Sequence, residues 1–288
     1  MAKIIDGKAI SQKIRDSIAE QRSVFTDRYG IRPGLAVIIV GDDPASQIYV
    51  NNKAKACDQV GFYSEVHRLS ADTTEDELKK LIVSLNSDVK IHGILVQLPI
   101  PSHIDEKAII SSISPMKDVD GFSEINTGKM ILDYEGLLPC TPAGIMAMLK
   151  HEGIDPDGKE CVVVGRSNIV GKPIAMLLLR ANGTVTVCHS HTKNLKEITK
   201  RADILVCAIG KSRFITGDMV KDGAAVIDVG INRDGQGKLS GDVDFDSVAP
   251  IASAITPVPG GVGPMTITML LQNTLNAAEK IMKKSMDK

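Results

Sequence analysis

The chain of 288 residues has no tryptophan, and aromatic residues make up only 3% of it. Such a sequence offers no row of aromatic side chains on which the bases of a single-stranded nucleic acid could stack. The formal net charge is -1, so the sequence also lacks the basic excess that binding to a phosphate backbone requires. We therefore expect no nucleic-acid partner.

Long apolar runs are also missing. Charged residues occur throughout the first twenty positions, which excludes the continuous apolar core of a secretory signal, and no apolar segment reaches membrane-spanning length. The sequence thus predicts a cytoplasmic protein without a membrane partner. Cysteines are few, odd in number and widely spaced, which fits neither a disulfide framework nor a zinc site. We expect them to be reduced core residues: Cys57, Cys140, Cys161, Cys188 and Cys207.

Short apolar, β-branched segments alternate with helical patterns through most of the chain. This alternation is typical of βαβ units and predicts an α/β fold with a parallel sheet. Pro44 suits the first position of a helix that follows Asp43, and Thr74 and Glu77 have the spacing of a capping box. Strands are expected at 34–41, 64–69 and 92–99 in the first half, and at 161–165, 184–188, 203–210 and 224–231 in the second.

A proline- and glycine-punctuated region separates the two halves. It contains a predicted helix at 141–151 and a turn-rich exit through Pro156 and Gly158, and we place a domain boundary there. Residues 253–266 are too rich in glycine and proline to predict regular structure, whereas 267–282 has the pattern of an amphipathic helix.

The stretch CVVVGRSNIVGKP leads from a predicted strand into a glycine turn. A P-loop has four residues between its glycines and a Ser or Thr after the lysine, but here five separate Gly165 from Gly171, and Pro173 follows Lys172. The dinucleotide-binding pattern of strand, tight turn and helix start fits better, although Ser167 stands in place of the second glycine. A plain connecting turn remains the alternative.

The following strand favours NADP over NAD. A classical NAD site has an acidic residue at the end of its second strand, yet 184–196 contains no carboxylate. Arg166 and Ser190 would instead bind a 2′-phosphate. His189 and His191 could share one face of a strand, but they have no Cys or Asp partner nearby, so we predict no metal site.

Residues able to transfer protons occur in the first half. Tyr49 and Lys53 are four apart, so on a helix they share a face with Cys57. Desolvation could bring the pKa of Lys53 towards neutrality, but from this spacing alone Lys53 and Lys55 more often mark a solvated helix surface.

Three further features are candidates for ligand binding. Gln97 interrupts an apolar segment at the carboxyl end of a predicted strand, where open α/β sheets bind ligands. Asp120 could pair with a polar heterocycle, but Asp-Gly is also an ordinary turn signal. Gly260 and Gly261 would let bare backbone approach a ligand, or they could merely form a connection into the last helix.

Six motifs occur in the same order as in a known family. The chain resembles the FolD family of bifunctional methylenetetrahydrofolate dehydrogenases/cyclohydrolases over almost its full length, and the glycine-rich motif and the Gln-Leu-Pro strand end are the most specific. Ile100 stands where many members have leucine, a difference that affects packing only. The motifs are YVNNKAKAC, ILVQLPIP, KDVDGF, GRSNIVGKP, VIDVGIN and PVPGGVGPMT.

The resemblance implies NADP-dependent oxidation of 5,10-methylenetetrahydrofolate and hydrolysis of the methenyl product to 10-formyltetrahydrofolate. It implies that Lys53 is the key catalytic residue, that Tyr49 positions the folate, that Gln97 modulates Lys53 and that Asp120 anchors the pterin. Gly260 and Gly261 would line the substrate cleft between the domains. The residues implied for NADP are Gly165, Arg166, Ser167, Ser190 and Ile231.

The resemblance further implies two α/β domains and a homodimer joined through the nucleotide domains. Residues 1–140 would form the catalytic, folate-binding domain, and a C-terminal helix at 265–284 would pack back on it. Residues 141–264 would form a Rossmann-like NADP-binding domain. Two alternatives are a dehydrogenase that has lost the hydrolase step and a non-catalytic NADP-binding module of the same fold.

Overall fold

The computed structural model describes residues 1–233 and 237–286. The chain divides into two compact units. The three-stranded unit comprises Lys13–Cys140 and Ile267–Lys288, and the six-stranded unit comprises Met1–Gln12 and Thr141–Thr266. Residues of two long helices, α1 (Gly7–Tyr29) and α10 (Val262–Met286), are divided between the units.

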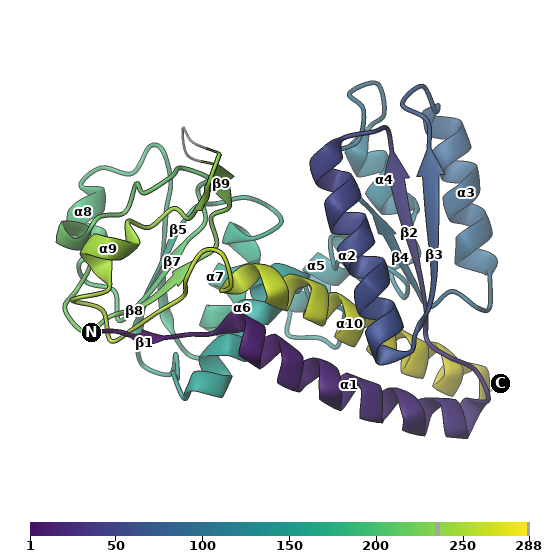
Figure 1. The fold of residues 1–288 in the computed structure, drawn as a ribbon, viewed down its shortest axis with the longest axis horizontal. Coiled ribbons are helices and arrows are strands. Elements are labelled where there is room, and N and C mark those ends of the chain that lie inside the picture. Colours follow the sequence, from purple (N-terminus) through teal and green to yellow (C-terminus); the bar gives the residue numbers. More distant parts are fainter. Residues whose placement is uncertain (234–236, 287–288) are drawn as a thin grey trace. The chain divides into compact units, whose positions relative to one another are not determined.

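The three-stranded unit is built on a parallel sheet of order β3-β2-β4 (Figure 1). Every residue of the central strand is buried, which explains its continuous apolar sequence GLAVIIV. Alternate residues of that strand, including Ile38, pack with the buried faces of α3 and α4. The strands are β2 (Gly34–Val40), β3 (Tyr63–Leu69) and β4 (Gly93–Val96), and the helices of this unit include α2 (Pro44–Val60), α3 (Glu75–Ser87), α4 (Glu106–Ser112) and α5 (Glu124–Ile131).

Two helix starts predicted from the sequence are confirmed. Helix α2 begins at Pro44, and the Asp43 carboxylate accepts from the backbone N–H of Ser46 at 2.8 Å. Helix α3 begins after the complete capping box of Thr74 and Glu77.

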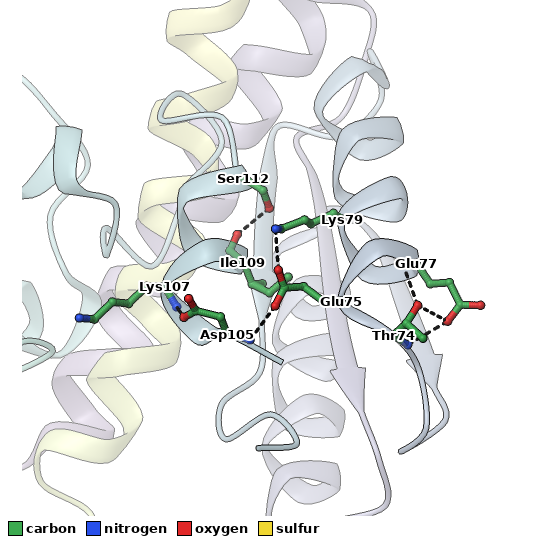
Figure 2. A network of polar contacts seen from close by, with 8 residues as sticks. All are labelled: Thr74, Glu75, Glu77, Lys79, Asp105, Lys107, Ile109 and Ser112. Atoms are coloured by element: carbon green, nitrogen blue, oxygen red, sulfur yellow. Dashed lines mark hydrogen bonds and ion pairs between the residues drawn. The ribbon is translucent and has the colours of Figure 1, made fainter. Parts of the chain in front are cut away.

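Figure 2 shows how the first turn of α3 also holds the start of α4. The carboxylate of Glu75 accepts from the backbone N–H of Asp105 at 2.8 Å and from Nζ of Lys79 at 2.7 Å. Asp105 in turn accepts from the N–H of Lys107, so one chain of polar contacts fixes both helix starts.

Replacing Thr74 by alanine should lower the free energy of unfolding by about 1 kcal/mol, because the hydroxyl accepts from the N–H of Glu77 and donates to its carboxylate. Urea unfolding would measure this loss. The variant Thr74→Ser keeps the hydroxyl and should stay close to the parent chain. Equal losses in both variants would contradict the capping role.

The six-stranded unit is an all-parallel sheet of order β1-β11-β8-β7-β5-β6. All four strands expected in the second half are present, as β5 (Glu160–Val164), β6 (Thr184–Cys188), β7 (Ile204–Cys207) and β8 (Ala225–Asp228). The remaining strands are β1 (Lys3–Ile4) and β11 (Ala254–Ile255), and β9 (Asn232–Arg233) pairs separately with β10 (Leu239–Ser240). The helices are α6 (Cys140–Glu152), α7 (Gly171–Arg180), α8 (Leu195–Thr199), α9 (Phe245–Val248) and the short 3₁₀ helix Gly217–Met219.

Three expectations needed correction. Strands β4, β7 and β8 each end three residues earlier than expected, and after β7 the amides of Ile209 and Gly210 donate to a side chain instead of to a neighbouring strand. Strands β1 and β11 are two residues long, which is too short to leave a sequence pattern. Helix α10 starts at Val262, inside the stretch expected to be irregular, because Pro264 falls in the first turn, where no helical N–H bond is lost.

All five cysteines are free and buried, as expected for core residues. Within residues 1–233 and 237–286, no helix is both long and apolar enough to cross a membrane.

Candidate active site

A lysine and a glutamine come together in the three-stranded unit. Lys53, on α2, donates from Nζ to Oε1 of Gln97 at 2.8 Å. Gln97 directly follows β4 and donates from its own Nε2 to the carbonyl of Leu98 at 2.6 Å. The second bond fixes the orientation of the amide, so its oxygen faces Lys53. Two residues that lie 44 positions apart in the sequence thus form one polar pair at the carboxyl end of a strand.

The surroundings of Lys53 differ from those of its neighbour Lys55. Lys53 is partly buried, whereas Lys55 is exposed. Burial lowers the pKa of Lys53, and the negative charge of Asp120 opposes that shift only in part. Lys53 is therefore closer to the neutral amine than a solvated lysine would be.

Asp120 is the carboxyl group that interacts with Lys53. The pKa of Asp120 is raised to about 6, mainly by burial, and the nearby charge of Asp118 contributes to this rise. The positive charge of Lys53 and a hydrogen bond with Cys140 oppose this rise. Asp120 therefore carries a proton more readily than an exposed aspartate does.

This pKa predicts a pH dependence of stability. Between about pH 4 and pH 6 the folded state keeps the Asp120 proton that the unfolded state has lost, so this group makes the protein less stable as pH rises. Replacing Asp120 by asparagine should reduce that fall in the free energy of unfolding by about 3 kcal/mol across the window. Urea unfolding at several pH values would measure it.

Asp58→Asn, which removes an exposed carboxylate on α2, is the matched control and should keep the parent slope. In Asp120→Asn the free energy of unfolding should still fall somewhat between about pH 4 and pH 6, because burial also raises the pKa of Asp228 to about 6. An unchanged slope in Asp120→Asn would show that Asp120 is not titrating in this range.

The loop that carries Asp120 is held by a second, deeply buried aspartate. Asp118 is only 2% exposed and accepts from the backbone N–H groups of Gly121, Phe122 and Ser123 at 3.1, 3.2 and 2.8 Å. Its carboxylate also accepts from Nδ2 of Asn126 at 2.9 Å. The Asp-Gly pair is therefore part of a loop built around Asp118, and not an isolated turn.

Asn273 on α10 supports the same loop and was not predicted from the sequence. Its Nδ2 donates to the carbonyls of Val119 and Leu138, both at 2.8 Å, and lies 3.7 Å from Sγ of Cys140. A polar residue at a buried position of an amphipathic helix was the only signal available.

Tyr49 lies one helical turn before Lys53 and is 42% exposed, whereas Cys57, one turn after Lys53, is fully buried. The shared face of α2 thus runs from the surface at Tyr49 into the core at Cys57, with Lys53 between them.

In the six-stranded unit, the glycine turn after β5 has no room for side chains. Gly165 has φ +129°, and a Cβ there would overlap the carbonyl oxygen of Ala208, which follows β7. A Cβ on Gly171 would overlap the carbonyl of Gly165. Strand β5 lies between β6 and β7: the crossover after β5 leads to β6 on one side, and the following crossover leads back to β7 on the other side, so the strand order reverses at this turn. Open α/β sheets bind ligands at that position.

Ser167 has a clear local role. Its hydroxyl accepts from the N–H groups of Val170 and Gly171, both at 3.2 Å, at the start of α7. A serine at this position therefore binds two amides at the start of α7, which a second glycine could not do.

The end of β6 carries donors and no carboxylate. The N–H of Gly165 donates to the carbonyl of Cys188 at 2.9 Å, so the turn lies beside the end of β6. Arg166 and Ser190 are both exposed. Nδ1 of His189 accepts from the N–H of His191 at 3.2 Å. The lone pair of Nδ1 is therefore occupied by this hydrogen bond and is not available to a metal. The turn and the strand end fit a dinucleotide with a 2′-phosphate.

The remaining predicted residues also belong to the six-stranded unit. Ile231 follows β8 and is 52% exposed. Gly261 packs so closely against Gly7 that a Cβ on Gly7 would overlap its carbonyl oxygen, and the N–H of Lys8 donates to the carbonyl of Gly260 at 3.2 Å. The first helix of the chain thus supports the glycine loop, a role for Gly7 that the sequence did not reveal.

Comparison with known proteins identifies the family. Residues 5–120 match the model of the tetrahydrofolate dehydrogenase/cyclohydrolase catalytic domain, and residues 139–282 match that of its NAD(P)-binding domain. The bifunctional protein FolD of Moorella thermoacetica is 59% identical over 97% of this chain and 99% of its own.

Solved structures agree. The bifunctional enzyme FolD from Campylobacter jejuni is 51% identical, with a TM-score of 0.95 over 98% of this chain and 100% of that one. The methylenetetrahydrofolate dehydrogenase-cyclohydrolase of Trypanosoma brucei, solved with NADP and an inhibitor, is 40% identical, with a TM-score of 0.93 over 98% of each chain. The two α/β domains, the parallel sheet of the second domain and both domain models lead to one conclusion: the chain belongs to the tetrahydrofolate dehydrogenase/cyclohydrolase family.

Proposed function

We propose that this chain is a bifunctional enzyme that oxidises 5,10-methylenetetrahydrofolate with NADP and hydrolyses the methenyl product to 10-formyltetrahydrofolate. The observation that carries the proposal is the hydrogen bond between Lys53 and Gln97, with the partly buried carboxyl of Asp120 as a nearby negative charge. A dehydrogenase needs chiefly to position its substrate, whereas the hydrolase step needs a group that can move protons, and Lys53 is suited to that task.

The dehydrogenase step relies on binding and orientation. When bound, NADP supplies the hydride acceptor. The chain's own contribution would be the glycine turn at Gly165, which lets backbone approach the pyrophosphate, and the donors of Arg166 and Ser190, which would pair with the 2′-phosphate. Ser167 would keep the start of α7 in place, and Ile231 would contact the cofactor with its exposed side chain.

The hydrolysis step would use Lys53 twice. As a neutral amine it takes a proton from water while the oxygen bonds to the methenyl carbon. It then returns this proton to the ring nitrogen as the bond between that nitrogen and the carbon breaks, and the remaining hydroxyl proton leaves to solvent as the oxygen becomes the formyl carbonyl. Gln97 accepts one N–H of Lys53, which directs the nitrogen lone pair away from the amide. No oxidant or reductant is needed in this step.

Folate recognition would involve the remaining predicted residues. Asp120 would bind the polar edge of the pterin, and Tyr49 would stack on the substrate with its exposed ring. Gly260 and Gly261 would line the substrate cleft with bare backbone, supported by Gly7.

A single assay tests the function. Purified protein would be mixed with methylenetetrahydrofolate and either NAD or NADP, while absorbance follows the reduced cofactor and the methenyl product together. We expect faster reduction of NADP than of NAD, and consumption of the methenyl product. Accumulation of that product would indicate a monofunctional dehydrogenase, and nucleotide binding without reduction would indicate a non-catalytic module.

We further propose a cytoplasmic homodimer. The support for the dimer is that, among residues 1–233 and 237–286, one edge of β6 has no strand partner in the sheet, and Val187 on β6 is exposed. Light scattering should give twice the mass of one chain, and Val187→Lys should shift the mass towards the monomer. A parent chain that remains monomeric would refute the dimer.

A further inference from the structure

Two buried aspartates of the six-stranded unit bind backbone amides of the loops after β7 and β8: Asp228, at the end of β8, and Asp242, just after β10. Asp242 is fully buried and accepts from four donors. Its Oδ2 accepts from the N–H groups of Ile209 and Gly210 at 2.6 and 3.0 Å. Its Oδ1 accepts from the N–H of Lys211 at 2.8 Å and from Nδ2 of Asn232 at 3.0 Å.

Asp228, the last residue of β8, holds the segment that carries Asp242. It is 3% exposed, and its Oδ1 accepts from the N–H groups of Gly230 and Asp242, both at 2.9 Å. Its Oδ2 accepts from the N–H of Val243 at 3.0 Å. We refer to Asp228 and Asp242 together as the aspartate clasp.

The backbone closes tightly around the aspartate clasp. A Cβ on Gly230 would overlap the carboxylate of Asp242, and a Cβ on Gly241 would overlap that of Asp228. All seven hydrogen bonds named above come from donors, so the environment suits an acceptor-only carboxylate on each residue.

The aspartate clasp holds the segments next to the predicted cofactor residues. Ile231 lies between Gly230, which donates to Asp228, and Asn232, which donates to Asp242. Ile209 directly follows Ala208, the residue whose carbonyl packs against Gly165. The same two side chains therefore fix the backbone on both sides of Ile231 and beside the glycine turn.

We propose that Asp242, held by Asp228, is a positioning residue for the pyridine dinucleotide, because it fixes the loops after β7 and β8 in the arrangement that receives the cofactor. This inference rests on the proposed NADP-dependent function. The inference predicts that a substitution of Asp242 weakens cofactor binding by more than the accompanying loss in the free energy of unfolding would explain.

The test is the variant Asp242→Asn, in which the side-chain NH2 group replaces one carboxylate oxygen and faces two donors. Calorimetric titration with NADPH should show a dissociation constant raised about tenfold, and the KM for NADP should rise by a similar factor while kcat changes by less than about threefold. Hydrolysis of added methenyltetrahydrofolate should stay within about twofold of the parent, because Lys53 belongs to the other unit.

Asp203→Asn is the matched control. Asp203 lies just before β7, at the amino ends of the strands and thus at the other end of the sheet from the aspartate clasp. It accepts from the N–H of Glu160 at 2.9 Å and from Nζ of Lys221 at 2.6 Å. This variant should lower the melting temperature and leave the NADPH dissociation constant unchanged. The inference is overturned if Asp242→Asn binds NADPH as the parent does, or if Asp203→Asn weakens binding equally.

A milder variant covers the case in which Asp242→Asn does not fold. Asn232→Ala removes only one donor to Asp242 and should raise the NADPH dissociation constant about threefold, and an unchanged constant would overturn the inference. A parent chain that does not bind NADPH would refute the proposed function itself, whereas normal binding by the parent and by every variant would refute only the role of Asp242.

Discussion

Replacing Lys53 by methionine should lower the cyclohydrolase rate by about 10²- to 10⁴-fold, the usual contribution of a general acid–base group. Methionine has a similar length and can fill the partly buried position, but it cannot carry a proton or donate to Gln97. NADPH binding should be retained, because the predicted nucleotide residues belong to the six-stranded unit. The rate of disappearance of methenyltetrahydrofolate, corrected for its spontaneous hydrolysis, is the measurement.

Lys55→Met provides the matched control on the same helix. Lys55 is exposed, so its loss should leave both activities within about twofold of the parent. Cyclohydrolase activity that survives in Lys53→Met would contradict the assignment of Lys53 as the proton-transfer group.

Alanine at Gly165 should destabilise the six-stranded unit by about 3 kcal/mol or more and abolish NADPH binding. The added Cβ meets the carbonyl of Ala208, and φ +129° is a conformation that residues with a side chain rarely adopt. The overlap could be relieved only if β5 and β7 moved apart at their carboxyl ends, where the N–H of Gly165 also donates to the carbonyl of Cys188. Urea unfolding and calorimetric titration with NADPH would measure the two effects.

Gly158→Ala separates conformational strain from steric overlap. Gly158 also has positive φ, at +68°, but a Cβ there meets nothing within 4 Å. It should cost about 1 kcal/mol and leave NADPH binding intact. Equal losses in the two variants would show that crowding against Ala208 is not the cause.

Local sequence signals were the most reliable. The capping box at Thr74, the proline at the start of α2 and the apolar runs of β2 and β5 identify elements whose energetics are set within a few residues. The distinction between Lys53 and Lys55 needed the three-dimensional structure, because both have the same charge and lie on the same helix.

Long-range polar contacts could not be predicted. The carboxylate of Asp242 binds amides more than thirty positions earlier in the chain, and Asn273 reaches carbonyls more than 130 positions away. No periodicity or spacing rule connects such residues, and a single sequence gives only the hint of polar groups near apolar segments. Glycines such as Gly230 and Gly7 are informative only once the atoms that they contact are known.

The position of β1 constrains the order in which the chain can fold. Lys3 pairs with Ala254, so the sheet of the six-stranded unit is incomplete until almost the whole chain has left the ribosome. The sheet of the three-stranded unit needs only residues 34–96. Sheets built from segments close in sequence form faster than those that join distant segments. We therefore expect the three-stranded sheet to form before β1 pairs with β11.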